Sequence, residues 1–372
     1  MIVGCPKEIK PQEYRVGLTP NAVKEISLHN HSVLIERNAG IGSGFSNEDY
    51  ISSGAKIIDE TEELFIKSEM IVKVKEPQKQ ERSLLREGQL LFTYLHLAPD
   101  LDQTKDLIKS KCTAIAYETV TDSFGRLPLL APMSEVAGRL APQVGAWTLQ
   151  KANGGSGILL GGVPGVSPAK VIIMGGGVVG VNAARIASGM GADVTILERS
   201  ISRLRFLDEN FKGMFKTIFS NSGNTLDLIS EADLIIGAVL IPGASAPNLV
   251  SKEQLKIMKN GSAIVDVAID QGGCFETSKP TTHENPIYEV EGIMHYCVAN
   301  MPGAVARTST IALGNSTMPF ILSLLNKGWK SACKDDQNLL NGLNVHAGHL
   351  TCKPVGNALN IKTIDPHSAL KI

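Results

Sequence analysis

The chain has 372 residues, of which 43% are hydrophobic and 20% charged, with 36 glycines and a formal net charge of −1. This length exceeds what one hydrophobic core normally organises, so the sequence predicts two domains. No block of like charges is present, which argues against a nucleic-acid-binding protein and favours a small molecule as the partner.

Cysteine usage and the N-terminus indicate the compartment. Six cysteines are scattered along the chain without a C-x-x-C pair, which favours reduced thiols in a cytoplasmic protein. The N-terminus has no charged leader before an apolar stretch. The longest apolar region, residues 157–181, is interrupted by Pro164, Pro168 and Lys170. We therefore expect no signal peptide and no membrane span.

The first third of the chain alternates short β-type runs with helical runs. Thr19 and Pro20 supply an N-cap and a first helical residue, so a helix is predicted to begin just after Leu18. Strands are predicted at 32–36, 70–75, 89–94 and 113–117. Strands spaced by helices predict parallel β-α-β units.

The rest of the chain repeats this alternation and then ends in a polar tail. Apolar residues at helical spacing predict a helix over 132–152, placed to bridge two domains. Four hydrophobic strands follow, at 170–174, 193–197, 233–238 and 262–266. They predict a second doubly wound sheet. Beyond a long helix at about 308–328 the tail shows no strand series of its own, so we assign it to the first domain.

The loop 175–180 reads Gly-Gly-Gly-Val-Val-Gly. A G-x-G-x-x-G pattern alone is weak evidence, but here it lies between a predicted strand and a helix-compatible segment, as dinucleotide binding requires. Gly175 permits the tight turn, Gly177 lets backbone N–H groups reach a pyrophosphate, and Gly180 lets the helix pack on the strand. The alternative is a purely structural glycine turn.

An acidic residue, Glu198, ends the next predicted strand. A carboxylate there accepts hydrogen bonds from the adenine ribose and repels a 2′-phosphate, which favours NAD(H) over NADP(H). Arg199, Arg203 and Arg205 follow closely and are able to grip a phosphate, so NADP(H) stays open as an alternative.

Five polar residues outside the glycine loop are candidates for chemistry. Lys73 and Lys75 lie at a predicted strand end, where ligands bind in open α/β sheets, and period 2 places both on one face. His96 follows another strand and can transfer protons near neutral pH. Asp270 fits a general base or a helix cap, and Arg15 fits a fork for a carboxylate. Taken singly, each is also explained as a solvated, core or capping residue.

Two histidine pairs have spacings that occasionally bind metal, His29 with His31 and His346 with His349. No nearby carboxylates or thiols complete either set. We therefore interpret these histidines as structural and expect no metal site.

Longer segments match a known superfamily in the same order along the chain. They are residues 7–10, 13–20, 74–77, 94–97, 130–139, 175–180, 265–273 and 298–305. On these segments the chain strongly resembles the alanine dehydrogenases of the alanine dehydrogenase and transhydrogenase α-subunit superfamily, from residue 1 to about residue 360.

The resemblance implies reversible, NAD-dependent oxidative deamination of L-alanine to pyruvate and ammonium. It implies an α/β fold of two Rossmann-like doubly wound domains, with an NAD-binding domain, 129–304, inserted in a discontinuous catalytic domain, 1–128 and 305–372. It also implies a homohexamer. The alternatives are a transhydrogenase α-subunit-like NAD(H)-binding protein with a membrane partner and a catalytically silent NAD-binding sensor.

The resemblance also assigns roles to individual residues. It implies that Arg15 and Lys75 hold the substrate's carboxylate and carbonyl oxygen, that His96 transfers protons and that Asp270 activates water. Around NAD, together with Gly175, Gly177 and Gly180, it places Ser134, Val178, Val179, Glu198, Arg203, Ser220, Val239, Leu240, Val267, Lys279, Val298, Asn300 and Met301. Most members have aspartate where this chain has Glu198, so the geometry of the ribose contact departs from the family pattern.

Overall fold

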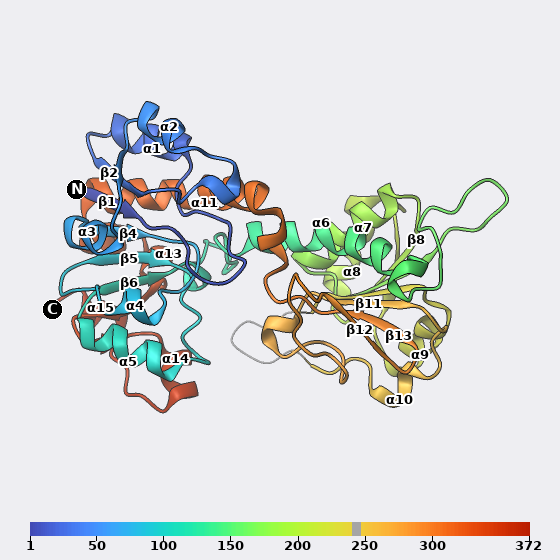
Figure 1. Ribbon diagram of the computed structural model, residues 1–372. Coiled ribbons are helices and arrows are strands. Elements are labelled where there is room, and N and C mark those ends of the chain that lie inside the picture. The colour runs from blue at the N-terminus through green and yellow to red at the C-terminus, as the bar shows by residue number, and fades with distance from the viewer. Residues whose placement is uncertain (240–246) are drawn as a thin grey trace. The chain divides into compact units, whose positions relative to one another are not determined.

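The computed structural model describes residues 1–239 and 247–372 (Figure 1). The chain divides into two compact units, each with its own sheet. Unit 1 comprises Met1–Met133 and Val305–Ile372, and unit 2 comprises Ser134–Ala304. One boundary lies inside the helix α6 (Ala131–Thr148), which is shorter at its C-terminal end than the predicted 132–152.

Unit 1 contains an eight-stranded sheet in the order β15-β14-β6-β5-β4-β1-β2-β3. Its strands are β1 (Ile2–Cys5), β2 (Ser32–Glu36), β3 (Lys56–Ile58), β4 (Met70–Val72), β5 (Leu90–Thr93), β6 (Thr113–Ala116), β14 (Leu343–His346) and β15 (His349–Leu350). The first six pair in parallel, and their order β3-β2-β1-β4-β5-β6 is that of a doubly wound fold.

The helices of unit 1 come from both ends of the chain. They are α1 (Pro20–Leu28), α2 (Asn47–Ser52), α3 (Thr61–Lys67), α4 (Lys79–Arg82), α5 (Leu101–Ser110), α11 (Ala306–Lys327), α12 (Trp329–Asp335), α13 (Gln337–Leu340), α14 (Lys353–Leu359) and α15 (Pro366–Ala369). The predicted start of α1 is confirmed, because the Thr19 side chain accepts the Ala22 N–H at 3.1 Å. The long helix α11 packs against α1 (Figure 1) and also against α12.

The prediction that the tail has no strands of its own was wrong. The strand β14 pairs antiparallel with β6 and carries β15 on its other side. Its polar members hid it in the sequence, yet Asn344 and His346 are both buried. Asn344 donates to Thr119 Oγ1 at 2.8 Å, and His346 Nδ1 lies 2.9 Å from Thr113 Oγ1. These hydrogen bonds offset the cost of burying polar groups in a strand.

Unit 2 contains a seven-stranded sheet in the order β12-β13-β11-β10-β7-β8-β9. Its strands are β7 (Lys170–Met174), β8 (Asp193–Glu198), β9 (Lys216–Phe219), β10 (Leu234–Gly237), β11 (Ala263–Asp266), β12 (Ile287–Val290) and β13 (Ile293–Tyr296). Its helices after α6 are α7 (Val178–Gly189), α8 (Ile201–Phe211), α9 (Ser222–Glu231) and α10 (Lys252–Leu255). Pairing is parallel except between β12 and β13.

Both faces of this sheet are buried, which explains the continuous hydrophobic runs in its strands. Val171 and Ile173 of β7 belong to one core cluster, whereas Ile172 and Met174 belong to another. Side chains alternate across a strand, so a strand covered on both faces must be apolar throughout. The predicted fold class, two Rossmann-like doubly wound domains, is confirmed. Over the described ranges, no helix combines the length and apolarity that crossing a membrane requires.

Candidate functional site

The polar candidates of unit 1 follow three strands that lie side by side in its sheet. Arg15 comes after β1, Lys75 after β4 and His96 after β5. Because β1, β4 and β5 are parallel neighbours, their carboxyl ends share one edge. The strand order reverses beside β1, and ligands of open α/β sheets bind at such a switch point.

Arg15 is buried, with 3% of its surface exposed, and is therefore not an ordinary surface arginine. Its guanidinium grips the Glu13 carboxylate with two bonds, Nε to Oε1 at 2.7 Å and Nη2 to Oε2 at 2.5 Å. Nη1 lies 3.1 Å from Met133 Sδ. Burial opposes the charge on Arg15, but the hydrogen bonds and charge of Glu13 outweigh it, so the pKa of Arg15 is raised. A permanently charged fork is thus held in place at this edge.

Lys73 and Lys75 occupy different environments, so the prediction that they share a face was wrong. The strand β4 ends at Val72 and the backbone bends at residues 74 and 75, which breaks the alternation. Lys73 is fully buried between Glu8 and Glu81, with N–O distances of 3.2 and 2.5 Å. Lys75 is half-buried. Lys73 is therefore a core ion pair, and Lys75 alone offers a partly accessible ammonium.

His96 is exposed and has a positive φ of 48°. Its backbone N–H donates to Glu118 Oε1 at 2.6 Å, and its ring stacks on the Tyr94 ring at 5.7 Å between centroids. A left-handed conformation in a residue other than glycine is uncommon and often marks a functional position. The strand end thus presents an accessible imidazole on a fixed backbone.

In the glycine loop of unit 2, the fold requires glycine at positions 175 and 180 but not at position 177. Gly175 has φ of 106°, which favours glycine, and a Cβ on Gly180 would lie 1.8 Å from the Gly175 carbonyl oxygen. Among the described residues, a Cβ on Gly177 would meet no atom within 4 Å. Gly177 is the N-cap of α7 and provides no capping side chain. The first N–H groups of α7 therefore receive no side-chain cap from Gly177, which suits an anion-binding helix start.

Glu198 connects the end of β8 to this loop. Its Oε2 accepts the Gly176 N–H at 2.8 Å, and its Oε1 accepts those of Arg199 and Ser200 at 2.8 and 2.9 Å. Arg203 is half-buried and donates from Nε to the Gly176 carbonyl at 2.6 Å; burial lowers its pKa. Glu198 and Arg203 are therefore both hydrogen-bonded to Gly176 of the glycine loop.

A cavity of about 480 Å³ opens beside the glycine loop, a size typical of ligand pockets. Among the predicted cofactor residues, those lining it are Gly175, Gly177, Glu198, Ser220 and Val239. Other lining residues, missed by the sequence reading, include Asn221, Thr225 and Leu249. Asn221 caps α9 by accepting the Asn224 N–H at 2.8 Å. An N-cap residue directly after β9 is therefore the sequence signal that could have identified Asn221.

The other predicted cofactor residues that the structure describes lie elsewhere in unit 2. Val178, Val179, Gly180 and Arg203 belong to the helices after β7 and β8, Ser134 lies in α6, and Val267, Lys279, Val298, Asn300 and Met301 follow β11 or β13. Asn300 has φ of 70°, and Val298 and Met301 are buried. Leu240 falls outside the described residues.

Asp270 is exposed in the short 3-10 helix η4 (Ile269–Gln271), which follows β11 in unit 2. The loop that carries it is organised by the buried Asp266. That carboxylate accepts the N–H groups of Ala268 and Cys274 at 3.0 and 2.7 Å and the Ser278 hydroxyl at 2.5 Å. Asp266 thus fixes the loop on both sides of Asp270.

Both histidines of the first pair, and His346 of the second, make side-chain contacts within unit 1. His29 and His31 both contact Asn326, at 3.2 and 2.9 Å. Among the residues that the structure describes, no group of three or more His, Cys, Asp or Glu side chains is arranged to hold a metal ion.

Two doubly wound sheets with polar loops at their carboxyl edges define a protein with the dinucleotide-binding fold. The family profile described as "Alanine dehydrogenase/PNT, N-terminal domain" matches residues 4–137, and the profile described as "Alanine dehydrogenase/PNT, C-terminal domain" matches residues 141–353. The chain therefore belongs to the alanine dehydrogenase/PNT family.

Individual relatives agree with this assignment. A protein of Halomonas elongata named alanine dehydrogenase is 55% identical, with 100% of both chains covered. A solved structure titled L-alanine dehydrogenase has 50% identity and a TM-score of 0.94, covering 97% of this chain and 99% of that one. A transhydrogenase from Sinorhizobium meliloti has 24% identity and a TM-score of 0.82, covering 94% and 100%, and supports the fold alone.

Proposed function

We propose that this protein is an NAD-dependent L-alanine dehydrogenase, which converts L-alanine and water to pyruvate and ammonium and catalyses the reverse reaction. One observation carries the proposal. Arg15, Lys75 and His96 follow adjacent parallel strands at one sheet edge, in a chain 55% identical over its full length to a protein named alanine dehydrogenase.

The substrate is a three-carbon acid, and its small size explains the charged residues. The Arg15 guanidinium, held from one side by Glu13, binds the carboxylate, and the Lys75 ammonium binds the carbonyl oxygen of pyruvate. Two charged contacts fix the orientation of a molecule that offers little apolar surface. Arg15 is well suited to this role because Glu13 and the surrounding core hold its guanidinium in one position.

The proton transfers fall to His96 and Asp270. When bound, NAD⁺ would supply the acceptor for the hydride that leaves the alanine Cα. Water then adds to the resulting imine carbon, and Asp270 assists by accepting a proton from that water. His96 exchanges protons with the substrate oxygen and nitrogen as the C–N bond breaks and ammonia leaves. In the reverse direction the same groups handle the same protons.

The cofactor belongs to unit 2, which we propose as the NAD-binding domain, with unit 1 as the catalytic domain. The glycine loop 175–180 and the helix start at Val178 suit a pyrophosphate. Glu198 suits the ribose hydroxyls and favours NAD(H) over NADP(H). The remaining residues that the resemblance places around NAD, Leu240 among them, are proposed contacts of the same cofactor.

Assembly and compartment are also part of the proposal. We propose a homohexamer in the cytoplasm, the assembly being that implied by the family resemblance. Reduced thiols suit this compartment, since all six cysteines are free. Analytical ultracentrifugation tests the assembly, and a stable monomer would contradict it.

Turnover of L-alanine by the purified protein tests the proposal. We expect NADH to form from L-alanine and NAD⁺, and NADH to be consumed with pyruvate and ammonium. His96→Ala and Asp270→Asn are expected to lose about 100-fold to 10,000-fold in turnover. Both are expected to keep their affinity for NADH. Unchanged rates in these variants would show that the chemistry has been misplaced.

The same assay separates the alternatives. A transhydrogenase-like protein or a silent NAD-binding sensor binds NADH but does not oxidise L-alanine. Intact NADH binding without any turnover of L-alanine would therefore exclude the dehydrogenase and leave these two.

A further inference from the structure

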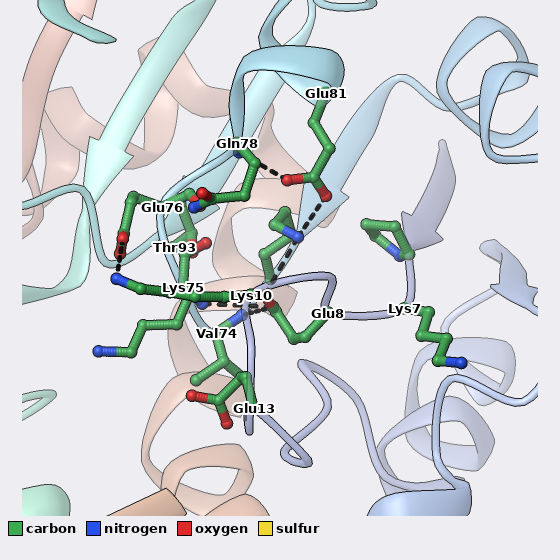
Figure 2. Close-up of polar contacts among 12 residues, drawn as sticks. Lys7, Glu8, Lys10, Glu13, Val74, Lys75, Glu76, Gln78, Glu81 and Thr93 are labelled. Atoms are coloured by element: carbon green, nitrogen blue, oxygen red, sulfur yellow. Dashed lines mark hydrogen bonds and ion pairs between the residues drawn. The ribbon is translucent and has the colours of Figure 1, made fainter. Parts of the chain in front are cut away.

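A buried cluster of three charged side chains lies next to the backbone of Lys75. Glu8, Lys73 and Glu81 come from the loop after β1, the end of β4 and the helix α4, and their side chains are 2%, 0% and 2% exposed. Lys73 Nζ lies 3.2 Å from Glu8 Oε2 and 2.5 Å from Glu81 Oε1. Figure 2 shows the labelled side chains of Glu8 and Glu81, with dashed lines to the ammonium group that lies between their carboxylates.

Within this triad, each charge favours the ionised form of its neighbour of opposite sign. Burial raises the pKa of Glu8, whereas the Lys73 ammonium acts in the opposite direction. The pKa of Lys73 is raised although burial would lower it, because two carboxylates flank its ammonium. Buried ion pairs often stabilise a fold no more than apolar residues of similar volume. The cost of desolvating these three charges therefore suggests that the triad has a role besides stabilising the fold.

That reason is visible in the backbone next to the triad. Glu8 Oε1 accepts the N–H of Val74 at 2.7 Å and the N–H of Lys75 at 3.2 Å. These two groups lie beyond the end of β4, and buried N–H groups require a partner. The Lys75 carbonyl accepts the Thr93 hydroxyl at 2.9 Å. The peptide groups on both sides of Lys75 are therefore held by side chains.

Glu81 differs from Glu8 in one respect that matters. Its Oε1 meets the same Lys73 ammonium, but its Oε2 accepts the Gln78 N–H at 2.7 Å, at the start of α4. Each carboxylate therefore shares the ion pair with Lys73, and Glu8 also holds the backbone of Lys75. The chain thus offers its own matched control.

We propose that Glu8 is a positioning residue for the reaction, whose carboxylate, oriented by Lys73, fixes the backbone of Lys75 and so the place of the Lys75 ammonium. This inference rests on the proposed function, which assigns Lys75 to the substrate. Glu8 acts through Lys75 and needs no contact of its own with the substrate.

The test compares Glu8→Asp with Glu81→Asp in the full-length protein. Both substitutions keep the charge of the triad and shorten one carboxylate, but only Glu8→Asp withdraws the acceptor from Val74 and Lys75. We expect the KM for pyruvate to rise about tenfold in Glu8→Asp and less than about twofold in Glu81→Asp. The KM for NADH is expected to stay unchanged in both variants.

A second set of variants keeps the comparison decisive if the shortened side chains disturb folding. Glu8→Gln retains an oxygen that can accept the two N–H groups, so its KM for pyruvate should lie closer to wild type than that of Glu8→Ala. Equal KM values for the Glu8 and Glu81 variants, or a parallel rise in the KM for NADH, would reduce Glu8 to a structural residue and overturn the inference.

A third variant separates this inference from the proposed function. If the wild type oxidises L-alanine and Lys75→Ala raises the KM for pyruvate, the proposed function stands whatever the Glu8 variants do. If the wild type fails to oxidise L-alanine, the proposed function and the inference that rests on it both fall.

Discussion

The Glu118 carboxylate accepts the backbone N–H of His96 at 2.6 Å and holds that residue in a left-handed conformation with φ of 48°. The same carboxylate accepts the Leu95 N–H at 3.1 and 3.2 Å. A backbone in this region costs about 1–3 kcal/mol and persists only where its surroundings enforce it. Glu118 lies in the 3-10 helix η2 (Tyr117–Thr119), directly after β6, so a neighbouring strand end supplies the enforcing group.

Removal of this acceptor should misplace the imidazole without touching the substrate directly. We expect Glu118→Ala to lower kcat for L-alanine by about tenfold or more, because small displacements of a catalytic group are costly. Affinity for NADH, measured by titration calorimetry, should not change. Glu87→Ala, at an exposed ion pair with Lys111, serves as the control and should leave kcat near wild type. Equal kcat values in the two variants would contradict the anchoring role of Glu118.

Replacement of glycine by alanine should cause different defects at two positions of the glycine loop, a folding defect at Gly180 and a binding defect at Gly177. Gly180→Ala places a Cβ 1.8 Å from the Gly175 carbonyl oxygen, so we expect a lower Tm and poor recovery of folded protein. In Gly177→Ala the added Cβ meets no atom of the described residues within 4 Å, so its Tm should match the wild type. Its Kd for NADH should nevertheless rise by about tenfold or more, because the added methyl group occupies the approach of the pyrophosphate. A Gly177→Ala variant with wild-type affinity would argue against pyrophosphate binding at this loop.

Much of the fold was predictable because buried parallel strands leave a strong signal. The strands β7, β10 and β11 are apolar apart from Lys170 at the start of β7 and Asp266 at the end of β11, and the structure places them in the middle of their sheet. The strands that escaped prediction include the edge strands β3, β9, β12 and β15 and their neighbour β14. β9 is largely accessible, and β14 buries Asn344 and His346 through hydrogen bonds to residues distant in sequence. Such tertiary partners cannot be read from local hydrophobicity.

The candidate site was predictable as a set of strand ends but not as a network. The sequence located Lys75 and His96 after their strands, yet nothing nearby in sequence identifies Glu8 or Glu118 as the partners of their backbones. The two lysines at 73 and 75 were read as equivalent because period 2 was assumed to continue past Val72. Backbone hydrogen bonds to carboxylates far away in sequence decide such positions, and only the fold brings them together.

The acidic residue at the end of β8 predicts cofactor preference. We expect Glu198→Gln to lower the ratio of kcat/KM for NAD⁺ to kcat/KM for NADP⁺ by about tenfold, since the amide no longer repels a 2′-phosphate. Overall affinity should fall for both cofactors, because Glu198 also holds the Gly176 N–H at 2.8 Å. Glu209→Gln, exposed on α8, is the control. A ratio that stays constant in Glu198→Gln would remove Glu198 from the ribose site.

The stability of unit 1 should depend on pH through His346. Its Nδ1 bonds Thr113 Oγ1, its ring lies 4.4 Å from that of Trp329, and its Nε2 is buried with no hydrogen-bond partner among the described residues. Burial lowers the pKa of His346 from 6.5, helped by the charges of Lys330 and His349. Between that lowered pKa and 6.5 the unfolded chain binds more protons than the folded one. Stability is therefore complete above pH 6.5 and falls as the pH drops through this window.

His346→Gln isolates this contribution, because glutamine can still bond Thr113 but does not titrate. The free energy of unfolding, measured by chemical denaturation from about pH 5 to about pH 8, should decline with acid in the wild type. The variant should decline less steeply, by up to about 1.4 kcal/mol for each pH unit in the window. The slope that remains for the whole chain includes His295 of unit 2, whose pKa burial also lowers. Parallel curves for wild type and His346→Gln would mean that His346 carries the same proton in the folded and unfolded states.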